Sequence, residues 1–89
     1  MPSEVVVIAS SVGLHARPAA LLIKAAAAAG VPVTIGRVGE TPINAASMLS
    51  VLALGCKHGE SVEITVADGP DSDLVLANLV SIVATNHDE

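Results

Sequence analysis

The 89-residue sequence predicts an α/β protein of the α+β type, an open-faced β-sandwich with the element order βαββαβα. Runs rich in β-branched residues near 4–9 and 60–67, with shorter strand patterns between them, predict a four-stranded, mainly antiparallel sheet. Three stretches with helical spacing of apolar residues predict helices that cover one face of this sheet. A ferredoxin-like βαββαβ arrangement is the nearest alternative, because its element order is almost identical.

The first third of the chain predicts a strand and a long helix. The strand is expected from Glu4 to Ala9, where the run from Val5 to Ile8 indicates a buried strand. The helix is expected from Ala16 to Ala29, through an alanine tract of high helix propensity, and Gly30 ends it. Its helical spacing turns four side chains toward the core: Ala19, Leu22, Ile23 and Ala26.

The middle of the chain predicts a hairpin and a short helix. A second strand is expected from Val31 to Arg37, and a tight turn at residues 38–40 leads into a short third strand from Thr41 to Ala45. Serine is a favourable N-cap residue, so Ser47 is expected to begin the short helix, which closes at Gly55.

The last third predicts a strand and a closing helix. Residues Glu60–Ala67 alternate most clearly, with one face formed by Val62, Ile64 and Val66. A proline and two carboxylates within residues 69–73 begin the last helix. This helix points Leu76, Leu79, Val80 and Val83 inward. No linker or repeat is visible, so residues 1–89 are expected to form a single domain.

Composition argues against several functions. A net charge of -5 disfavours binding to a nucleic-acid backbone, and the lack of Phe, Tyr and Trp removes the stacking platforms of RNA-binding sheets. The single cysteine, Cys56, excludes an internal disulfide and suits a reducing compartment. Without a basic leader or a membrane-length apolar stretch, we expect a soluble, cytoplasmic protein with no membrane insertion. The three histidines lack metal-ligand spacing, with His58 in an exposed turn at 57–59 and His87 in the tail, so no metal or cofactor is expected.

The segment between the first strand and the first helix carries the chemistry: Gly13-Leu14-His15-Ala16-Arg17-Pro18-Ala19. A helix start presents unpaired N–H groups and partial positive charge, and Ala16, Arg17 and Pro18 form that start. The fork of Arg17 fits phosphate oxygens. The helix start also disfavours an imidazolium, which leaves His15 with a nucleophilic nitrogen suited to accepting a phosphoryl group. The alternative is a solvent-exposed histidine beside a helix cap.

This segment resembles the active-site signature of the HPr family, the histidine-containing phosphocarriers of the bacterial phosphoenolpyruvate:sugar phosphotransferase system. A second stretch, from Asn44 through Leu49 to Gly55, is similar to the family's regulatory serine and the short helix after it. The likeness covers nearly the whole chain. It implies that phosphorylated Enzyme I transfers phosphate to the pros nitrogen of His15, and that the A domains of sugar permeases receive it. The chain would then be a carrier and not an enzyme.

The resemblance also implies a docking surface beside His15. Its apolar part would be the helix row formed by Met48, Leu49 and Leu52, while Val51 and Leu54 form a different row of the same helix. Only one row can face the sheet. Leu21 and Lys24, which share an outward row with Arg17, would extend the surface. The alternative is that the short helix is buried on most sides.

Ser47 has two interpretations. By resemblance it matches a serine that a dedicated kinase phosphorylates in some bacteria, which would add a serine kinase or phosphorylase to the partners and block docking electrostatically. Ala46 stands where regulated members often carry lysine, so we favour a capping role alone. Val12 departs from the Ser, Thr or Asn common in the family, and Ser11 is the candidate substitute for that phosphate contact.

Two other functional classes compete with the carrier. An HPr-like regulatory module acting by binding alone would not need both His15 and Arg17, which the chain retains. A small hydrolase would need a second acid or base near His15, and the sequence offers none there. A carrier presents one face to successive partners, so we expect a monomer.

Overall fold

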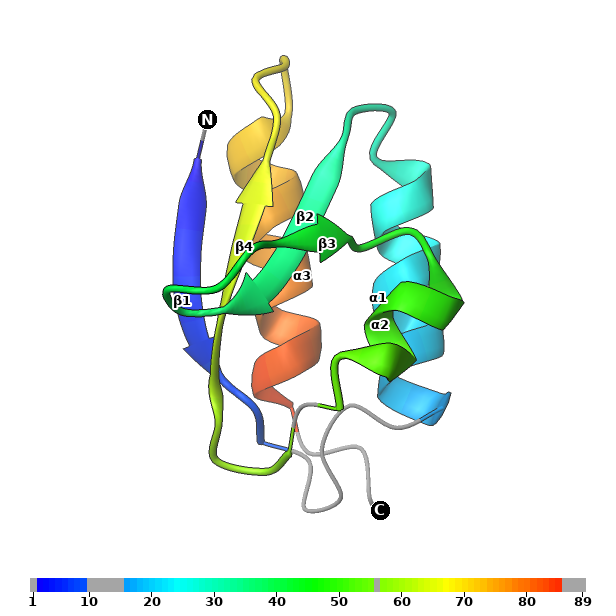
Figure 1. The fold of residues 1–89 in the computed structure, drawn as a ribbon. Coiled ribbons are helices and arrows are strands. Elements are labelled where there is room, and N and C mark those ends of the chain that lie inside the picture. Colours follow the sequence, from blue (N-terminus) through cyan, green and yellow to red (C-terminus); the bar gives the residue numbers. More distant parts are fainter. Residues whose placement is uncertain (1, 10–15, 56, 86–89) are drawn as a thin grey trace.

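The computed structural model describes residues 2–9, 16–55 and 57–85, with the backbone alone at 16–18. Within these residues the elements follow the predicted order βαββαβα (Figure 1). They are β1 (Ser3–Val7), α1 (Ala16–Ala28), β2 (Val33–Arg37), β3 (Ile43–Asn44), α2 (Met48–Ala53), β4 (Ser61–Val66) and α3 (Ser72–Ala84). Strand β3 is shorter than predicted, with two residues in place of the expected five.

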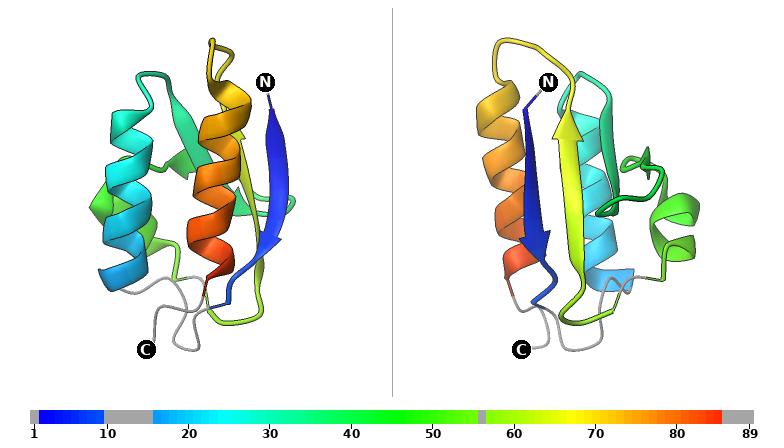
Figure 2. Two further views of the ribbon diagram at one scale, coloured as in Figure 1. Left: turned by 180° about the vertical axis from the view of Figure 1, so that it is seen from behind. Right: turned by 60° about the vertical axis from the view of Figure 1, so that its left-hand side comes forward.

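The strands form one sheet in the order β1-β4-β2-β3. Every neighbouring pair is antiparallel, with Val5 opposite Glu63 and Ile35 opposite Ile64. Two views from other directions show α1 and α3 side by side on one face of the sheet, while α2 lies near β3 and packs against α1 (Figure 2). The predicted open-faced α+β sandwich is therefore confirmed.

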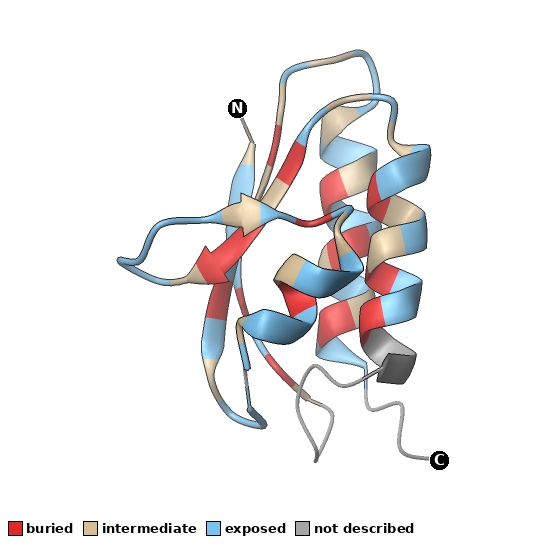
Figure 3. Ribbon diagram, turned by 45° about the vertical axis from the view of Figure 1, so that its right-hand side comes forward, coloured by how far each residue is buried: buried red, intermediate tan, exposed pale blue. Residues whose placement is uncertain are grey.

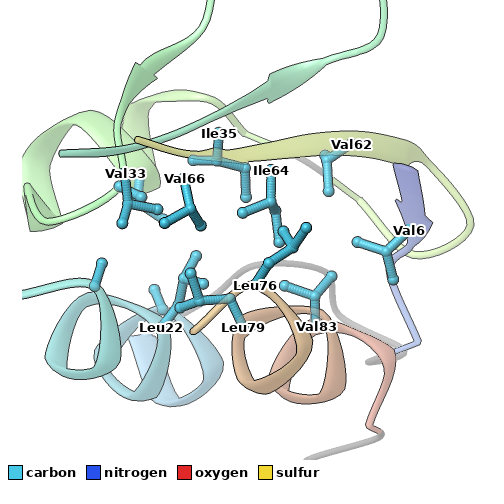
Figure 4. Close-up of a cluster of buried hydrophobic side chains, with 14 of the residues drawn as sticks. Val6, Leu22, Val33, Ile35, Val62, Ile64, Val66, Leu76, Leu79 and Val83 are labelled. Carbon is cyan, nitrogen blue, oxygen red and sulfur yellow. The ribbon is translucent and has the colours of Figure 1, made fainter. Parts of the chain in front are cut away.

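The core fills the space between the sheet and the two long helices (Figure 4). Ile64 of β4 and Ile35 of β2 project from the sheet toward Leu22 of α1 and Leu79 of α3, and all four side chains are fully buried. Each such side chain contributes roughly 1.5–3 kcal/mol through removal from water. The predicted alternation in β4 is confirmed, because Val62, Ile64 and Val66 are all fully buried.

The prediction that β1 is buried along its length was wrong. Val6 and Ile8 are in the core, but Val5 and Val7 are 51% and 54% exposed. The reason is that Val5 and Val7 alternate with the core residues and lie on the face of the sheet that α1 and α3 do not cover, and an antiparallel sheet tolerates one solvated face. Among the predicted inward residues of the long helices, Ile23 and Val80 are only half-buried.

Candidate functional site

Helix α1 begins at Ala16, as predicted, directly after His15 in the sequence. Its first turn contains no acidic residue, so no carboxylate within this turn opposes an anion at the helix start. His15 itself lies outside the described residues, as do Ser11, Val12, Cys56 and His87. The side chain of Arg17 also lies outside the description, so the predicted roles of both residues stay predictions.

Helix α2 is positioned by a cap and one buried anchor. The Ser47 hydroxyl oxygen accepts a hydrogen bond from the Ser50 N–H at 3.3 Å, which confirms the predicted N-cap. Just upstream, the side-chain oxygen of Asn44 accepts a bond from the Ala46 N–H at 2.9 Å. Val51 is fully buried and is the contact of α2 with the core. This short helix is therefore held with a definite face outward.

The outward face of α2 is apolar. Met48, Leu49 and Leu52 are 40%, 82% and 41% exposed, and Leu21 on the neighbouring α1 is 42% exposed. The predicted separation into two rows is confirmed, because Val51 is buried and Leu54 is half-buried. Figure 3 shows a buried stretch of α2 between exposed ones. We call these four exposed side chains the α1–α2 patch. Lys24 is exposed on α1 as well. Exposed apolar side chains on two helices in contact with each other are typical of partner-binding surfaces.

The C-terminal end of α2 is held by Arg37, a residue that the sequence did not single out. Its Nη1 donates to the Leu54 carbonyl at 2.8 Å and its Nη2 to the Gly55 carbonyl at 3.2 Å. Its Nε donates to Oε2 of Glu60, forming a half-exposed ion pair. Arg37 and Glu60 are 23 residues apart, so no local pattern joins them. The antiparallel pairing of β2 with β4 brings them together, since Arg37 lies opposite Val62.

Glu60 connects this interaction to the end of β1. Its Oε1 accepts from the Lys57 N–H at 2.9 Å, and its backbone carbonyl accepts from the Ile8 N–H at 3.0 Å. The Gly59 N–H in turn donates to the Ile8 carbonyl at 3.0 Å. The hydrogen bond from Arg37, followed by the one from the Lys57 N–H, holds the pKa of the Glu60 carboxyl below its usual range. His58 is exposed in this turn, as predicted.

In the parts of the chain that the structure describes, no three His, Cys, Asp or Glu side chains lie close enough to hold a metal ion. Over the same residues, none of the helices has the length and apolar character needed to cross a bilayer.

Comparisons with known proteins agree with the fold and with the motif around His15. The family model for the PTS HPr component phosphorylation site matches residues 2–85. A phosphocarrier protein HPr of Streptomyces coelicolor is 46% identical over 77 residues, covering 86% of this chain and 82% of that protein. Another from Haloferax volcanii is 43% identical over 74 residues, covering 82% of each chain. The crystal structure of HPr from Bacillus anthracis has a TM-score of 0.81 at 28% identity, covering 92% of this chain and 95% of that one. The chain belongs to the HPr family, the phosphocarriers of the phosphotransferase system.

Proposed function

We propose that this phosphocarrier accepts a phosphoryl group from phosphorylated Enzyme I on the pros nitrogen of His15, and that it passes the group to the A domains of sugar permeases. The transfer would take place in the cytoplasm. The observation that carries the proposal is the start of α1 directly after His15, with an acid-free first turn, on the helix that packs against α2. Membership in the HPr family supports the same role.

The reaction follows from the chemistry of a neutral imidazole. The lone pair of the ring nitrogen attacks phosphorus, an N–P bond forms, and the bond between phosphorus and the donor's group breaks. The transferred phosphoryl oxygens carry negative charge beside the N–H groups at the start of α1, where Arg17 adds a guanidinium. A helix start contributes about 0.3–2 kcal/mol toward such a charge, a moderate value that leaves the group able to move to an acceptor.

The α1–α2 patch is the proposed binding surface for both the phosphoryl donor and the phosphoryl acceptor proteins. Its four apolar side chains come from two helices that pack against each other, and α1 is the helix that begins after His15. A protein seated on Leu49 and Leu52 would cover apolar surface, while Lys24 offers a charge on the same helix as Leu21. One surface used in turn by two partners suits a monomer.

The test is phosphorylation of the purified chain by Enzyme I and phosphoenolpyruvate, followed by mass spectrometry. We expect one phosphate on His15 with the acid lability of a phosphoramidate. His15→Ala should accept none, while His58→Ala and His87→Ala should accept phosphate as the wild type does. Phosphate on the His15→Ala protein would show a different acceptor. An unmodified wild type would leave a regulatory module that acts by binding alone.

A further inference from the structure

We infer that Arg37 is a positioning residue for phosphotransfer, because it fixes the end of α2 to the turn that holds the end of β1. The residues involved are Arg37, Leu54, Gly55, Lys57 and Glu60, which we call the Arg37 clamp. The inference rests on the proposed function, since it concerns how the α1–α2 patch is held relative to the segment that carries His15.

The guanidinium of Arg37 joins two separate segments of the chain. Three nitrogen donors of Arg37 contact three acceptors on two separate segments: the carbonyls of Leu54 and Gly55, and the carboxylate of Glu60. The donors of a guanidinium point in fixed directions in one plane, so together they define where these acceptors lie relative to β2. The point charge of a lysine on a flexible stem would not do so.

Helix α2 has few other attachments to the rest of the protein. The helix has six residues, and only Val51 among them is buried. Helices this short are not stable on their own, and their last carbonyls need partners from outside the helix. No basic residue in the last turn of α2 supplies such a partner. The donors for Leu54 and for Gly55, whose φ of +63° takes the chain out of the helix, come from Arg37 on β2.

Glu60 connects Arg37 to the end of β1. One carboxylate oxygen of Glu60 accepts a hydrogen bond from the Arg37 Nε, and the other accepts one from the Lys57 N–H. The second bond closes the turn at 57–60. The backbone of this same turn exchanges two hydrogen bonds with Ile8, both at 3.0 Å. The chain continues from Ile8 and Ala9 into the segment 10–15, which contains His15. Hydrogen bonds and short stretches of chain therefore connect the α1–α2 patch to the end of β1.

The consequence is a specific kinetic defect when the clamp is broken. Release of the Leu54 and Gly55 carbonyls would let α2 shift on its single buried anchor, and the exposed row that contains Leu49 would move with it. Partners would then dock less well on a protein that is still folded. The KM for phosphorylated Enzyme I should rise, while kcat at saturation should change little.

The experiment compares Arg37→Gln with a control, Glu63→Gln, which removes an exposed carboxylate on β4 outside the clamp. For Arg37→Gln we expect the KM for phosphorylated Enzyme I to rise about tenfold, a smaller effect than the ~10²-fold cost of misplacing reacting groups by 1 Å. Arg37→Lys should recover part of this loss. The double variant Arg37→Glu with Glu60→Arg should not recover the KM. It can restore the ion pair, but a glutamate at position 37 cannot donate to the Leu54 and Gly55 carbonyls.

Amide hydrogen exchange on the same proteins gives a readout that does not depend on phosphate. In Arg37→Gln, exchange should speed up at Lys57, Gly59 and Ile8 while Ile64 in the central strand β4 keeps its wild-type rate. A wild-type KM for Arg37→Gln together with unchanged exchange rates would overturn the inference. A uniform increase in exchange rates that includes Ile64 would also overturn it, because such an increase reports a loss of global stability. If the wild type takes no phosphate from Enzyme I, the proposed function fails and the exchange pattern alone decides whether the clamp exists.

Discussion

At the scale of single residues, Glu60 shows how the fold changes the chemistry of one carboxyl group. Arg37 and the Lys57 N–H both donate to its charged form, and they lower its pKa from the ordinary value of 4.5. The unfolded chain therefore binds this proton more tightly than the folded protein does. The contribution of Glu60 to stability is present above pH 4.5 and is lost as the pH falls through the lower, folded-state pKa.

The prediction is a carboxyl titration, followed by NMR, whose midpoint for Glu60 lies below 4.5. The amide signal of Lys57 should follow the same curve, because its N–H donates to the titrating group. Arg37→Gln removes the larger cause and should move the midpoint upward. A midpoint that is the same in both proteins would mean that the ion pair does not persist in solution.

Arg17 carries the second prediction at this scale. A charge-assisted hydrogen bond from an arginine to phosphate is worth roughly 1.5–3 kcal/mol, and each 1.4 kcal/mol corresponds to about tenfold in rate. Arg17→Ala should slow transfer from Enzyme I by about one to two powers of ten, as measured by rapid-quench kinetics. Arg17→Lys should recover only part of the rate, because a point charge lacks the planar fork. If Arg17→Ala accepts and donates phosphate at wild-type rates, the helix start alone stabilises the phosphoryl group and Arg17 has no part in it.

At the scale of elements, the residues that fix α2 in place differ from the residues that α2 exposes to solvent. The Ser47 cap and Val51 fix it, while Leu49 is 82% exposed and contributes little to the core. Leu74 on α3 is a matched control, because it is 70% exposed and belongs to a helix on which no docking surface is proposed. The two leucines allow the same substitution to be compared on two exposed faces.

Leu49→Glu should leave the unfolding transition unchanged within about 0.5 kcal/mol and reduce kcat/KM for phosphorylated Enzyme I by at least about tenfold. The loss arises because a partner seated on the patch would desolvate an unpaired carboxylate. Leu74→Glu should have neither effect. Steady-state transfer assays on both variants, with circular dichroism to verify folding, make the measurement. Equal rates for the two would place docking on another surface.

The sequence predicted the elements better than it predicted their surroundings. The spacing of apolar residues, together with the turn and capping residues between them, predicted each helix and strand that the structure describes, and it separated Val51 from the exposed row of α2. It did not show that Val5 and Val7 lie on a solvated face of β1, because the run Val5–Ile8 is equally typical of a strand covered on both faces. The Arg37 clamp was also missed, since its members meet only through the pairing of β2 with β4. Local sequence patterns carry no information about contacts between residues that are distant in the sequence and meet only through strand pairing.

At the scale of the whole molecule, the core that stabilises the fold and the proposed docking surface lie in separate regions. The core side chains lie between the sheet and the two long helices (Figure 4), whereas the side chains of the α1–α2 patch are exposed to solvent. Ile64 is fully buried at the centre of this core and has no atom in the patch. A change at Ile64 should therefore affect how much protein is folded, and not what the folded protein does.

Ile64→Ala removes three carbons from a closely packed site and should cost about 2–5 kcal/mol, out of the ~5–15 kcal/mol typical of a whole domain. The sequence lacks Trp, Tyr and Phe, so urea unfolding has to be followed by far-UV circular dichroism instead of intrinsic fluorescence. The midpoint should fall while the slope with urea stays constant. At low temperature, where the variant is still folded, its KM and kcat with phosphorylated Enzyme I should match the wild type, in contrast to Leu49→Glu. A matching loss of transfer in folded Ile64→Ala would show that the core sets the geometry of the patch directly, because no surface group has been altered.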